Sequence, residues 1–336
     1  LASENEGVGL FDQELKAYLA LGGLINYESP VTKILFENSE VVGVLVKNKS
    51  IEADSVILAS GGFEANDELR KLYIGKDWGA AKVRGTPHNT GDGLMMALDI
   101  GAMKHGLYDG CHATPMDLYM KNYGGLDLEP SERKNYRKIC YFLGIMVNAE
   151  GKRFLDEGKN FRNYTYAQYG RKVLEQSGNF AWQIFDSKVF DLLYEEYRFH
   201  DAHFVEGTTL DDIISKLEGV DKNEVKTTIQ EYNDSVDTKI EFDPTILDGK
   251  STKGLEISKS NWAQKLDKGP FKAFPVTGGI TFTYGGLKVS ENGSVINTDN
   301  KPIKGLFACG ELIGGVFFNG YPGGSGLTSG AVFGRI

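Results

Sequence analysis

The chain has 336 residues, 41% of them hydrophobic and 25% charged, which excludes a disordered chain and suffices for about two domains. Its net charge of −9 comes without a basic stripe, so we expect no general binding to nucleic acid, although a local cationic pocket stays open. No apolar run approaches the ~18 residues of a membrane-spanning helix, and we expect no intrinsic membrane span.

The first 60 residues predict a helix followed by short strands. Residues 8–21 carry an apolar stripe that stops at Gly22, as in an amphipathic helix. Short apolar or alternating runs between turn residues predict strands of a small antiparallel sheet at 24–27, 31–36, 41–46 and 50–53. Residues 55–60 predict a buried strand that ends at two glycines, where backbone can approach another group closely.

The amino-acid composition changes twice along the rest of the chain. Residues from about 111 to 271 are rich in aromatic side chains, and 224–238 predict a helix. Glycine-rich sequence returns after Pro275. We therefore expect an α/β domain made of residues 1–110 and 272–336, with an α+β domain of residues 111–271 inserted into it.

The three cysteines form no CxxC pair and are odd in number. Free thiols in a reducing compartment are the simplest interpretation, so we expect a cytoplasmic protein without a metal site.

Four glycine motifs follow one another along the chain. They are VILASGGF at 56–63, NTGDGL at 89–94, GLFACGE at 305–311 and YPGGSGLT at 321–328. A lone motif of this kind usually serves a tight turn. In this order and spacing, the four resemble the FAD-binding domain of the fumarate reductase and succinate dehydrogenase flavoproteins.

The resemblance implies FAD as cofactor. The acidic residue of the third motif, Glu311, would bind a ribityl hydroxyl, and a helix starting after Gly324 would direct N–H groups at electron-rich flavin oxygen. The residues implied in FAD binding are Val31, Ala59, Ser60, Gly61, Thr90, Gly91, Asp92, Gly93, Gly310, Glu311, Gly324, Ser325, Gly326, Leu327 and Thr328.

The resemblance also implies catalytic residues. Residues 152–157 followed by 161–163 resemble the family segment G-x-R-F-x-x-E...R-D, and Arg162 falls near its catalytic, proton-delivering arginine. Arginine is a poor acid at neutral pH, so the alternative is that Arg162 only binds an anionic substrate or a neighbouring carboxylate. His112 stands where the family has a substrate-facing histidine, and the alternative there is a structural histidine.

Three departures separate this chain from the fumarate and succinate enzymes. The family's E-x-x-R-G proton relay is replaced by RKIC at 137–140, its H-T-M-G-G segment becomes residues 282–286 with Tyr284, and the arginine of N-R-x-G-G becomes Tyr321. Two carboxylate-clamping groups are thereby lost, which argues against true fumarate reductase activity. We expect Tyr284 and Tyr321 to orient the substrate instead.

Longer matching sequence segments favour one branch of the family. Residues 83–87, 161–166 and 279–286 resemble the tricarballylate dehydrogenase-like branch, whereas Tyr321 is similar to a tyrosine of ketosteroid dehydrogenases. The implied function is an FAD-dependent oxidoreductase that transfers hydride between flavin N5 and a carbon–carbon bond activated by a carboxylate or carbonyl. Its partners would be a small-molecule carboxylate and an electron-transfer partner. The alternatives are a ketosteroid-type dehydrogenase or a truncated, non-catalytic binding module.

One family feature is missing. Family members open with a strand and a G-x-G-x-x-G turn that holds the FAD pyrophosphate, and no such pattern precedes the first predicted helix. We therefore expect a partial FAD-binding domain that lacks its N-terminal βαβ unit, joined to a substrate-capping domain. The chain would be either a piece of a longer enzyme or a naturally truncated relative.

Overall fold

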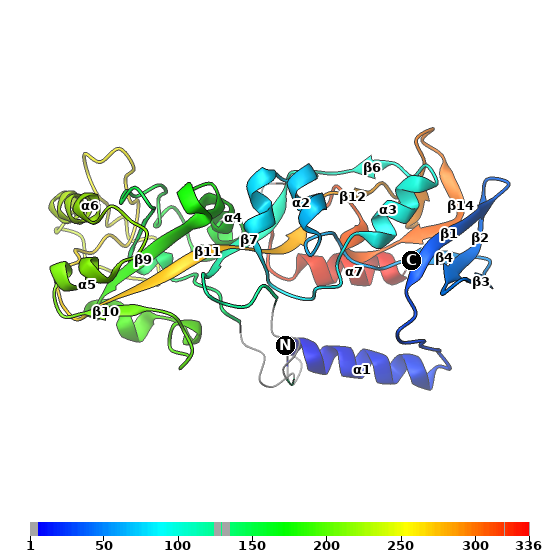
Figure 1. Cartoon of the computed structure of the whole chain (residues 1–336), viewed down its shortest axis with the longest axis horizontal. Helices are drawn as coiled ribbons and strands as arrows, with labels where there is room; N and C mark the ends of the chain where they lie inside the picture. Colours follow the sequence, from blue (N-terminus) through cyan, green and yellow to red (C-terminus); the bar gives the residue numbers. More distant parts are fainter. Residues whose placement is uncertain (1–5, 124–128, 130–134, 319, 336) are drawn as a thin grey trace.

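The computed structural model describes residues 6–123, 129, 135–318 and 320–335. Two six-stranded sheets lie toward opposite ends of an elongated molecule, and most helices pack between or beside them (Figure 1). The predicted mixed α/β fold is confirmed. Among the described residues, no helix is long and apolar enough to cross a membrane.

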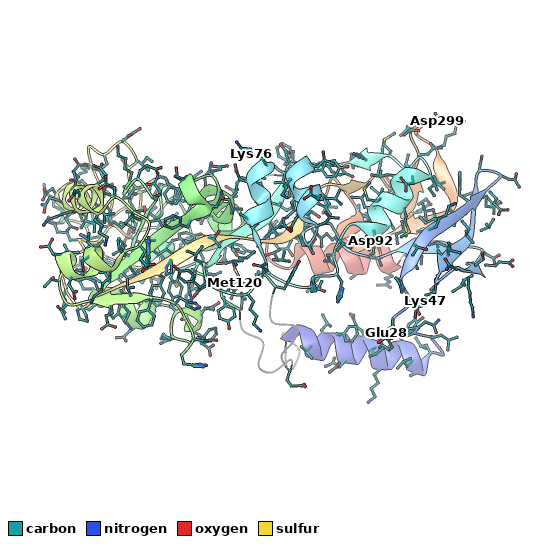
Figure 2. The ribbon with its side chains drawn as sticks, viewed as in Figure 1. Glu28, Lys47, Lys76, Asp92, Met120 and Asp299 are labelled. Carbon is teal, nitrogen blue, oxygen red and sulfur yellow. The ribbon has the colours of Figure 1, made fainter. Side chains whose placement is uncertain are left out.

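The N-terminal helix α1 spans Glu6–Ala20 and ends ahead of Gly22, as its apolar stripe predicted. None of its described side chains from residue 7 onward is buried, and it lies beside the body of the molecule (Figures 1 and 2). The strand predicted at 24–27 is wrong, because these residues form an exposed coil and turn that pairs with no described strand.

The first sheet combines strands from both ends of the chain. Two tight turns with left-handed residues at 38–39 and 47–48 connect β1, β2 and β3 as antiparallel neighbours. β14 joins β2 and β4 in parallel and β13 in antiparallel orientation. The strands are β1 (Val31–Glu37), β2 (Glu40–Val46), β3 (Lys49–Glu52), β4 (Val56–Leu58), β13 (Ser294–Ile296) and β14 (Pro302–Ala308).

The buried strand predicted at 55–60 is shorter and less covered than expected. Only β4 within it is extended, and Leu58 is buried while Ile57 is 67% exposed. β4 pairs with a single described strand, β14, and so lies at an edge of the sheet. Successive side chains of a strand point to opposite faces, so Leu58 joins the apolar core while Ile57 lies on the uncovered face.

Small elements cover the first sheet and lead to the centre of the molecule. They are α2 (Asp67–Tyr73), the 3-10 helix η1 (Lys76–Ala80), β5 (Lys82–Val83), α3 (Asp92–Asp99), β6 (Lys104–His105), β12 (Gly286–Leu287), η7 (Gly310–Leu312) and α7 (Ser325–Arg335). Phe63, Leu94, Ala97 and Leu306 belong to one apolar core between this layer and the sheet.

The second sheet is built around β11. Its order is β10-β11-β9-β8, and β5 and β7 also pair with β11. The strands are β7 (Cys111–Asp117), β8 (Ile145–Val147), β9 (Phe180–Asp186), β10 (Val205–Gly207) and β11 (Phe271–Thr283). β11 therefore joins segments from both predicted parts of the chain, whose boundaries stay a prediction.

Helices flank the second sheet. α4 (Arg162–Leu174) packs against β7 and β11, α5 spans Leu210–Lys216, and α6 spans Lys222–Ser235 where 224–238 was predicted helical. The remaining 3-10 helices are η3 (Tyr141–Leu143), η4 (Ser177–Asn179), η5 (Ser187–Leu192) and η6 (Glu195–Tyr197). A Cβ on Gly170 would lie 2.6 Å from Ala113 C, so glycine lets α4 approach β7 closely.

Candidate active site

His112 lies at the centre of an aromatic cluster. β7 places it opposite Phe282 of β11, and its side chain is almost completely buried, at 2% exposure. Its ring centroid lies 4.9 Å from that of Tyr166 in α4 and 4.9 Å from that of Tyr321. The histidine thus joins a sheet strand, α4 and the loop before α7.

The charge state of His112 follows from these surroundings. Burial, with the nearby positive charges of Arg84 and Arg137, lowers the pKa of His112 to about 4, so the ring is neutral at pH 7. Its Nδ1 is buried and makes no hydrogen bond within the described residues. A neutral imidazole with an unused nitrogen can orient a polar ligand group, although buried polar atoms are usually paired.

Arg162 is the first residue of α4, one turn ahead of Tyr166. Its Nε donates a hydrogen bond to the Tyr194 hydroxyl at 2.9 Å, and its guanidinium carbon lies 5.1 Å from the Tyr194 ring centroid. The positive charges of Arg84, Arg162 and Arg137 all act on Tyr166, whose pKa is nevertheless raised because burial outweighs them. Arg162 therefore lies near the His112 cluster, because Tyr166, one helical turn away in α4, contacts His112.

Tyr321 is fixed from two directions. Its ring packs against Phe282 and Phe317, with centroid separations of 5.6 and 5.1 Å. Its hydroxyl accepts a hydrogen bond from Gly326 N, in the first turn of α7, at 3.1 Å. Tyr321 also lines a pocket of about 470 Å³ between the start of α4 and the glycine turn before α7.

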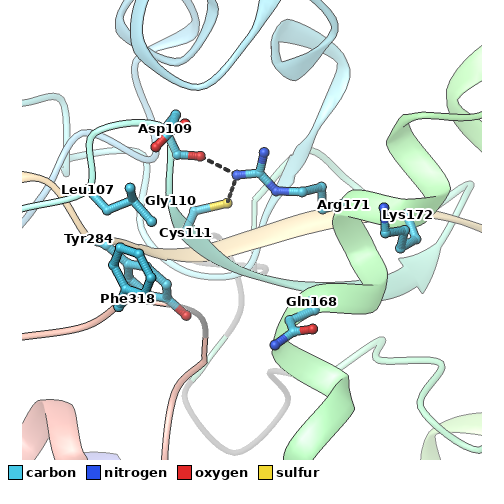
Figure 3. A pocket seen from close by; sticks show the side chains of 9 residues that line it. All are labelled: Leu107, Asp109, Gly110, Cys111, Gln168, Arg171, Lys172, Tyr284 and Phe318. Carbon is cyan, nitrogen blue, oxygen red and sulfur yellow. Dashed lines mark hydrogen bonds between the residues drawn. The ribbon is translucent and has the colours of Figure 1, made fainter. Parts of the chain in front are cut away.

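Tyr284 lies in a different pocket, although the same aromatic cluster reaches it through Phe317 at 5.5 Å. That pocket has a volume of about 550 Å³ and includes Arg171, which donates hydrogen bonds to Asp109 O and, at 3.9 Å, to Cys111 Sγ (Figure 3). Burial raises the pKa of Tyr284, so its hydroxyl stays protonated. The structure therefore groups His112 with Tyr321, places Arg162 nearby, and sets Tyr284 at a neighbouring pocket.

The first predicted cofactor residues meet at the ends of two parallel strands. β4 and β14 end together, and Cys309 N donates to Leu58 O at 3.0 Å, which sets residues 59–61 beside 309–311. A Cβ on Gly93 would lie 2.1 Å from Ser60 Oγ, so the start of α3 packs tightly against this edge. Thr90 donates to Asp92 Oδ2 at 3.0 Å and helps to shape that start. Val31 opens β1, on the outer side of the same sheet.

Glu311 shares a buried site with a second carboxyl group that the sequence did not single out. Its Oε1 accepts hydrogen bonds from Thr283 N at 2.7 Å and Thr283 Oγ1 at 3.0 Å. Glu64 lies beside it and accepts from Asn89 Nδ2 at 2.5 Å. Burial, reinforced by the charge of Glu64, raises the pKa of Glu311 well above its ordinary value. One proton on Glu311 therefore satisfies the pair.

The residues before and within α7 fit a flat cofactor. Among the residues that the structure describes, no atom lies within 4 Å of a Cβ built on Gly310, Gly323 or Gly324, so the backbone is open there. α7 buries none of its described side chains, and Leu327 is 70% exposed. An open glycine turn and an uncovered apolar side chain can accommodate a flat ring system, and a helix N-terminus favours electron-rich oxygens on its edge.

No group of three or more His, Cys, Asp or Glu side chains that could hold a metal ion occurs within the described ranges. Cys111 and Cys140 are buried free thiols, and burial raises the pKa of each to about 12, so neither is reactive as a thiolate near neutral pH.

Parallel strands that end in glycine turns at a helix N-terminus define a nucleotide-cofactor-binding fold. Residues 6–327 match the model of the family described as FAD binding domain, and the chain belongs to that family. FAD is therefore the cofactor that the fold implies, in agreement with the residues around Gly324.

Relatives confirm the resemblance to fumarate reductase flavoproteins. The chain is 29% identical to the probable fumarate reductase Ifc3 of Shewanella frigidimarina, over 99% of this chain and 53% of that protein. It is 29% identical to a 4-oxocyclohex-2-ene-1-carboxylate 5-dehydrogenase of Sinomonas cyclohexanicum, over 83% of this chain and 49% of that protein. The open conformation of a flavocytochrome c3 fumarate reductase matches with a TM-score of 0.74 at 27% identity, covering 97% of this chain and 54% of that one. The chain thus spans about half the length of the curated relatives it matches.

Sequence reasoning missed Glu64, Arg84 and Tyr166 as members of this region. The strings that carry Arg84 and Tyr166 were noted for their resemblance, but nothing in a linear pattern shows that both side chains face His112. Glu64 directly follows the first glycine motif, and that adjacency was the available signal.

Proposed function

We propose that this chain acts as an FAD-dependent oxidoreductase on a carbon–carbon bond next to a carboxylate or carbonyl group of a small molecule. The observation that carries the proposal is the His112 cluster, which sits beside three arginines and is tied through Tyr321 to the first turn of α7. FAD, when bound, supplies hydride donation or acceptance at its N5 atom.

The protein's own residues would then transfer the proton and orient the substrate. Arg162 would hold a proton on its guanidinium and give it to, or take it from, the substrate carbon next to the one that exchanges hydride. Its Nε donates a hydrogen bond to the Tyr194 hydroxyl, which fixes the direction of its guanidinium. His112 and Tyr321 would orient a substrate oxygen, and Tyr284 would border the neighbouring pocket.

The substrate is proposed to be a carboxylate of the tricarballylate type. Relatives named for fumarate and for an oxocyclohexenecarboxylate support an acid, and three arginines near Tyr166 give the site a local excess of positive charge in a chain of net charge −9. A separate electron-transfer partner would exchange electrons with the flavin.

A ketosteroid-type reaction is the second candidate. Phe282 and Phe317 connect the rings of Tyr284 and Tyr321 into one aromatic cluster, which would suit a bulky apolar ketone. This candidate requires turnover of neutral ketones and indifference to carboxylates.

The test is turnover of tricarballylate with an artificial electron acceptor by FAD-loaded holoprotein expressed from its natural gene. Arg162→Ala is expected to lower kcat by at least about 100-fold while the dissociation constant for tricarballylate changes little. Arg198→Ala, at an exposed arginine, is the matched control. Near-normal turnover of Arg162→Ala would remove Arg162 from the chemistry. Failure of the holoprotein to bind flavin would favour a non-catalytic binding module.

A further inference from the structure

Arg84 reaches the predicted substrate site from a different direction than Arg162. It directly follows β5, and its backbone N–H donates to Ile280 O of β11 at 2.8 Å. At the same stretch of β11, β7 pairs through Ala113 opposite Ile280 and His112 opposite Phe282. Two strand spacings of about 4.8 Å each separate β5 from β7, a span that an arginine side chain can cover.

The charges around Arg84 locate its guanidinium. Arg84 and Arg137 both lower the pKa of His112, and Arg84 acts on Tyr166 as well. In return, Tyr166, Glu196 and Tyr321 favour the charged form of Arg84. The guanidinium therefore lies near the His112, Tyr166 and Tyr321 cluster, and Arg84 as a whole is only partly exposed to solvent.

Arg84 is half-buried, and it differs from Arg70 and Arg153 because its guanidinium has no partner among the residues that the structure describes. Arg70 donates to several backbone oxygens and to Asp67 at 2.7 Å, and Arg153 forms an ion pair with Glu157 at 2.5 Å. For the guanidinium of Arg84, no hydrogen bond or ion pair occurs with any residue that the structure describes.

Nearby groups do not compensate for that charge. Glu196 is the carboxylate whose charge favours the charged form of Arg84, but it already forms an ion pair with Arg137 at 2.6 Å. Burial, with the repulsion of Arg137, lowers the pKa of Arg84 to about 10, which still leaves it charged at pH 7. A largely buried cation without a paired anion is costly, and an anionic ligand relieves that cost.

We propose that Arg84 binds a substrate carboxylate beside His112 and Tyr321, and so selects acids over neutral ketones. The inference rests on the proposed oxidoreductase function and narrows its substrate class. A guanidinium pairs with a carboxylate through two parallel hydrogen bonds, and the unused Nδ1 of His112 and the Tyr321 ring border the same space.

The test measures binding to the FAD-loaded holoprotein. Dissociation constants for tricarballylate, succinate and the neutral ketone cyclohexanone are obtained from shifts of the oxidised flavin band in the Arg162→Ala background, which is expected to bind substrate without reducing the flavin, and flavin content and melting temperature check folding. Arg84→Met is expected to weaken binding of the acids by about 30-fold or more and to leave cyclohexanone within about twofold. Arg84→Lys is expected to recover part of the loss, because it keeps the charge without the two-pronged geometry.

Arg198→Met changes the net charge equally at an exposed arginine and is expected to bind the acids like wild type. Acid binding by Arg84→Met equal to that by Arg198→Met would overturn the inference and leave the proposed function intact. A wild-type holoprotein that binds and turns over the ketone but neither acid would overturn the inference and the proposed carboxylate substrate, and would leave a flavin oxidoreductase acting on a ketone.

Discussion

The Tyr321 hydroxyl accepts a hydrogen bond from Gly326 N at 3.1 Å, and this single contact ties the predicted substrate site to the predicted flavin site. The Tyr321 ring touches His112, whereas Gly326 lies in the first turn of α7. Tyr321 therefore contacts both sites. The arginine that the family has at this position has no hydrogen-bond acceptor in its side chain and could not accept the bond from Gly326 N.

Removing that hydroxyl is the first prediction. Tyr321→Phe keeps the ring contacts but leaves Gly326 N without its acceptor, so we expect a loss of about 1 kcal/mol in unfolding free energy. Urea unfolding of the variant beside wild type measures it. Tyr27→Phe, at an exposed tyrosine, is the control and should change nothing. Equal stability of Tyr321→Phe and wild type would show that the bond contributes nothing.

The buried carboxyl pair predicts a pH dependence of stability. The folded-state pKa of Glu311 is raised by burial and by Glu64, so the native state holds a proton that the unfolded chain releases above about pH 4.5. The stability from this group is complete below that pH and declines as pH rises toward the folded pKa, by at most about 1.4 kcal/mol per pH unit.

Glu311→Gln carries a permanent neutral group and should flatten that decline. Unfolding free energies at pH 5, 6, 7 and 8 for wild type and variant give the difference, and the exposed Glu291→Gln is the control. Parallel pH profiles for wild type and Glu311→Gln would contradict a protonated Glu311.

The electrostatic contact between Arg84 and His112 makes a third prediction. The pKa of His112 is about 4, lowered first by burial and then by the charge of Arg84. Arg84→Met should raise this pKa, and the His112 resonance in an NMR titration should shift its midpoint upward. An unchanged midpoint would mean that the two side chains do not face each other.

Close packing of α4 on the second sheet makes a fourth prediction. A Cβ on Gly170 would lie 2.6 Å from Ala113 C, an atom of β7 backbone that cannot move aside easily. Gly170→Ala should therefore cost about 2 kcal/mol or more in unfolding free energy. Gly7→Ala, in α1 with open space around it, should be neutral or slightly stabilising. A Gly170→Ala variant as stable as wild type would contradict this packing.

Local sequence rules predicted the elements that depend on local features. The helix at 8–21 and the hairpin strands at 31–36, 41–46 and 50–53 follow from periodicity and turn residues, and they form with shifts of one or two positions. The segment 24–27 failed because an apolar run becomes a strand only beside a partner strand, and the sequence does not state which partners exist.

The site was predictable only where a motif carries it. Glycine motifs located the turn at Gly324 and the buried Glu311, because backbone geometry and family resemblance fix both. Arg84 and Tyr166 are brought to His112 by the pairing of β5 and β7 with β11 and by the packing of α4, which are long-range relationships. Local sequence patterns cannot predict such long-range strand pairings and helix packing.

The most direct test of the central claim is the flavin absorbance of the FAD-loaded holoprotein, expressed from its natural gene and mixed without oxygen with tricarballylate. We expect the oxidised flavin band to bleach with tricarballylate and to return when an artificial electron acceptor is added. A protein that holds flavin but keeps its band unchanged with tricarballylate, while a neutral ketosteroid bleaches it, would contradict a carboxylate oxidoreductase.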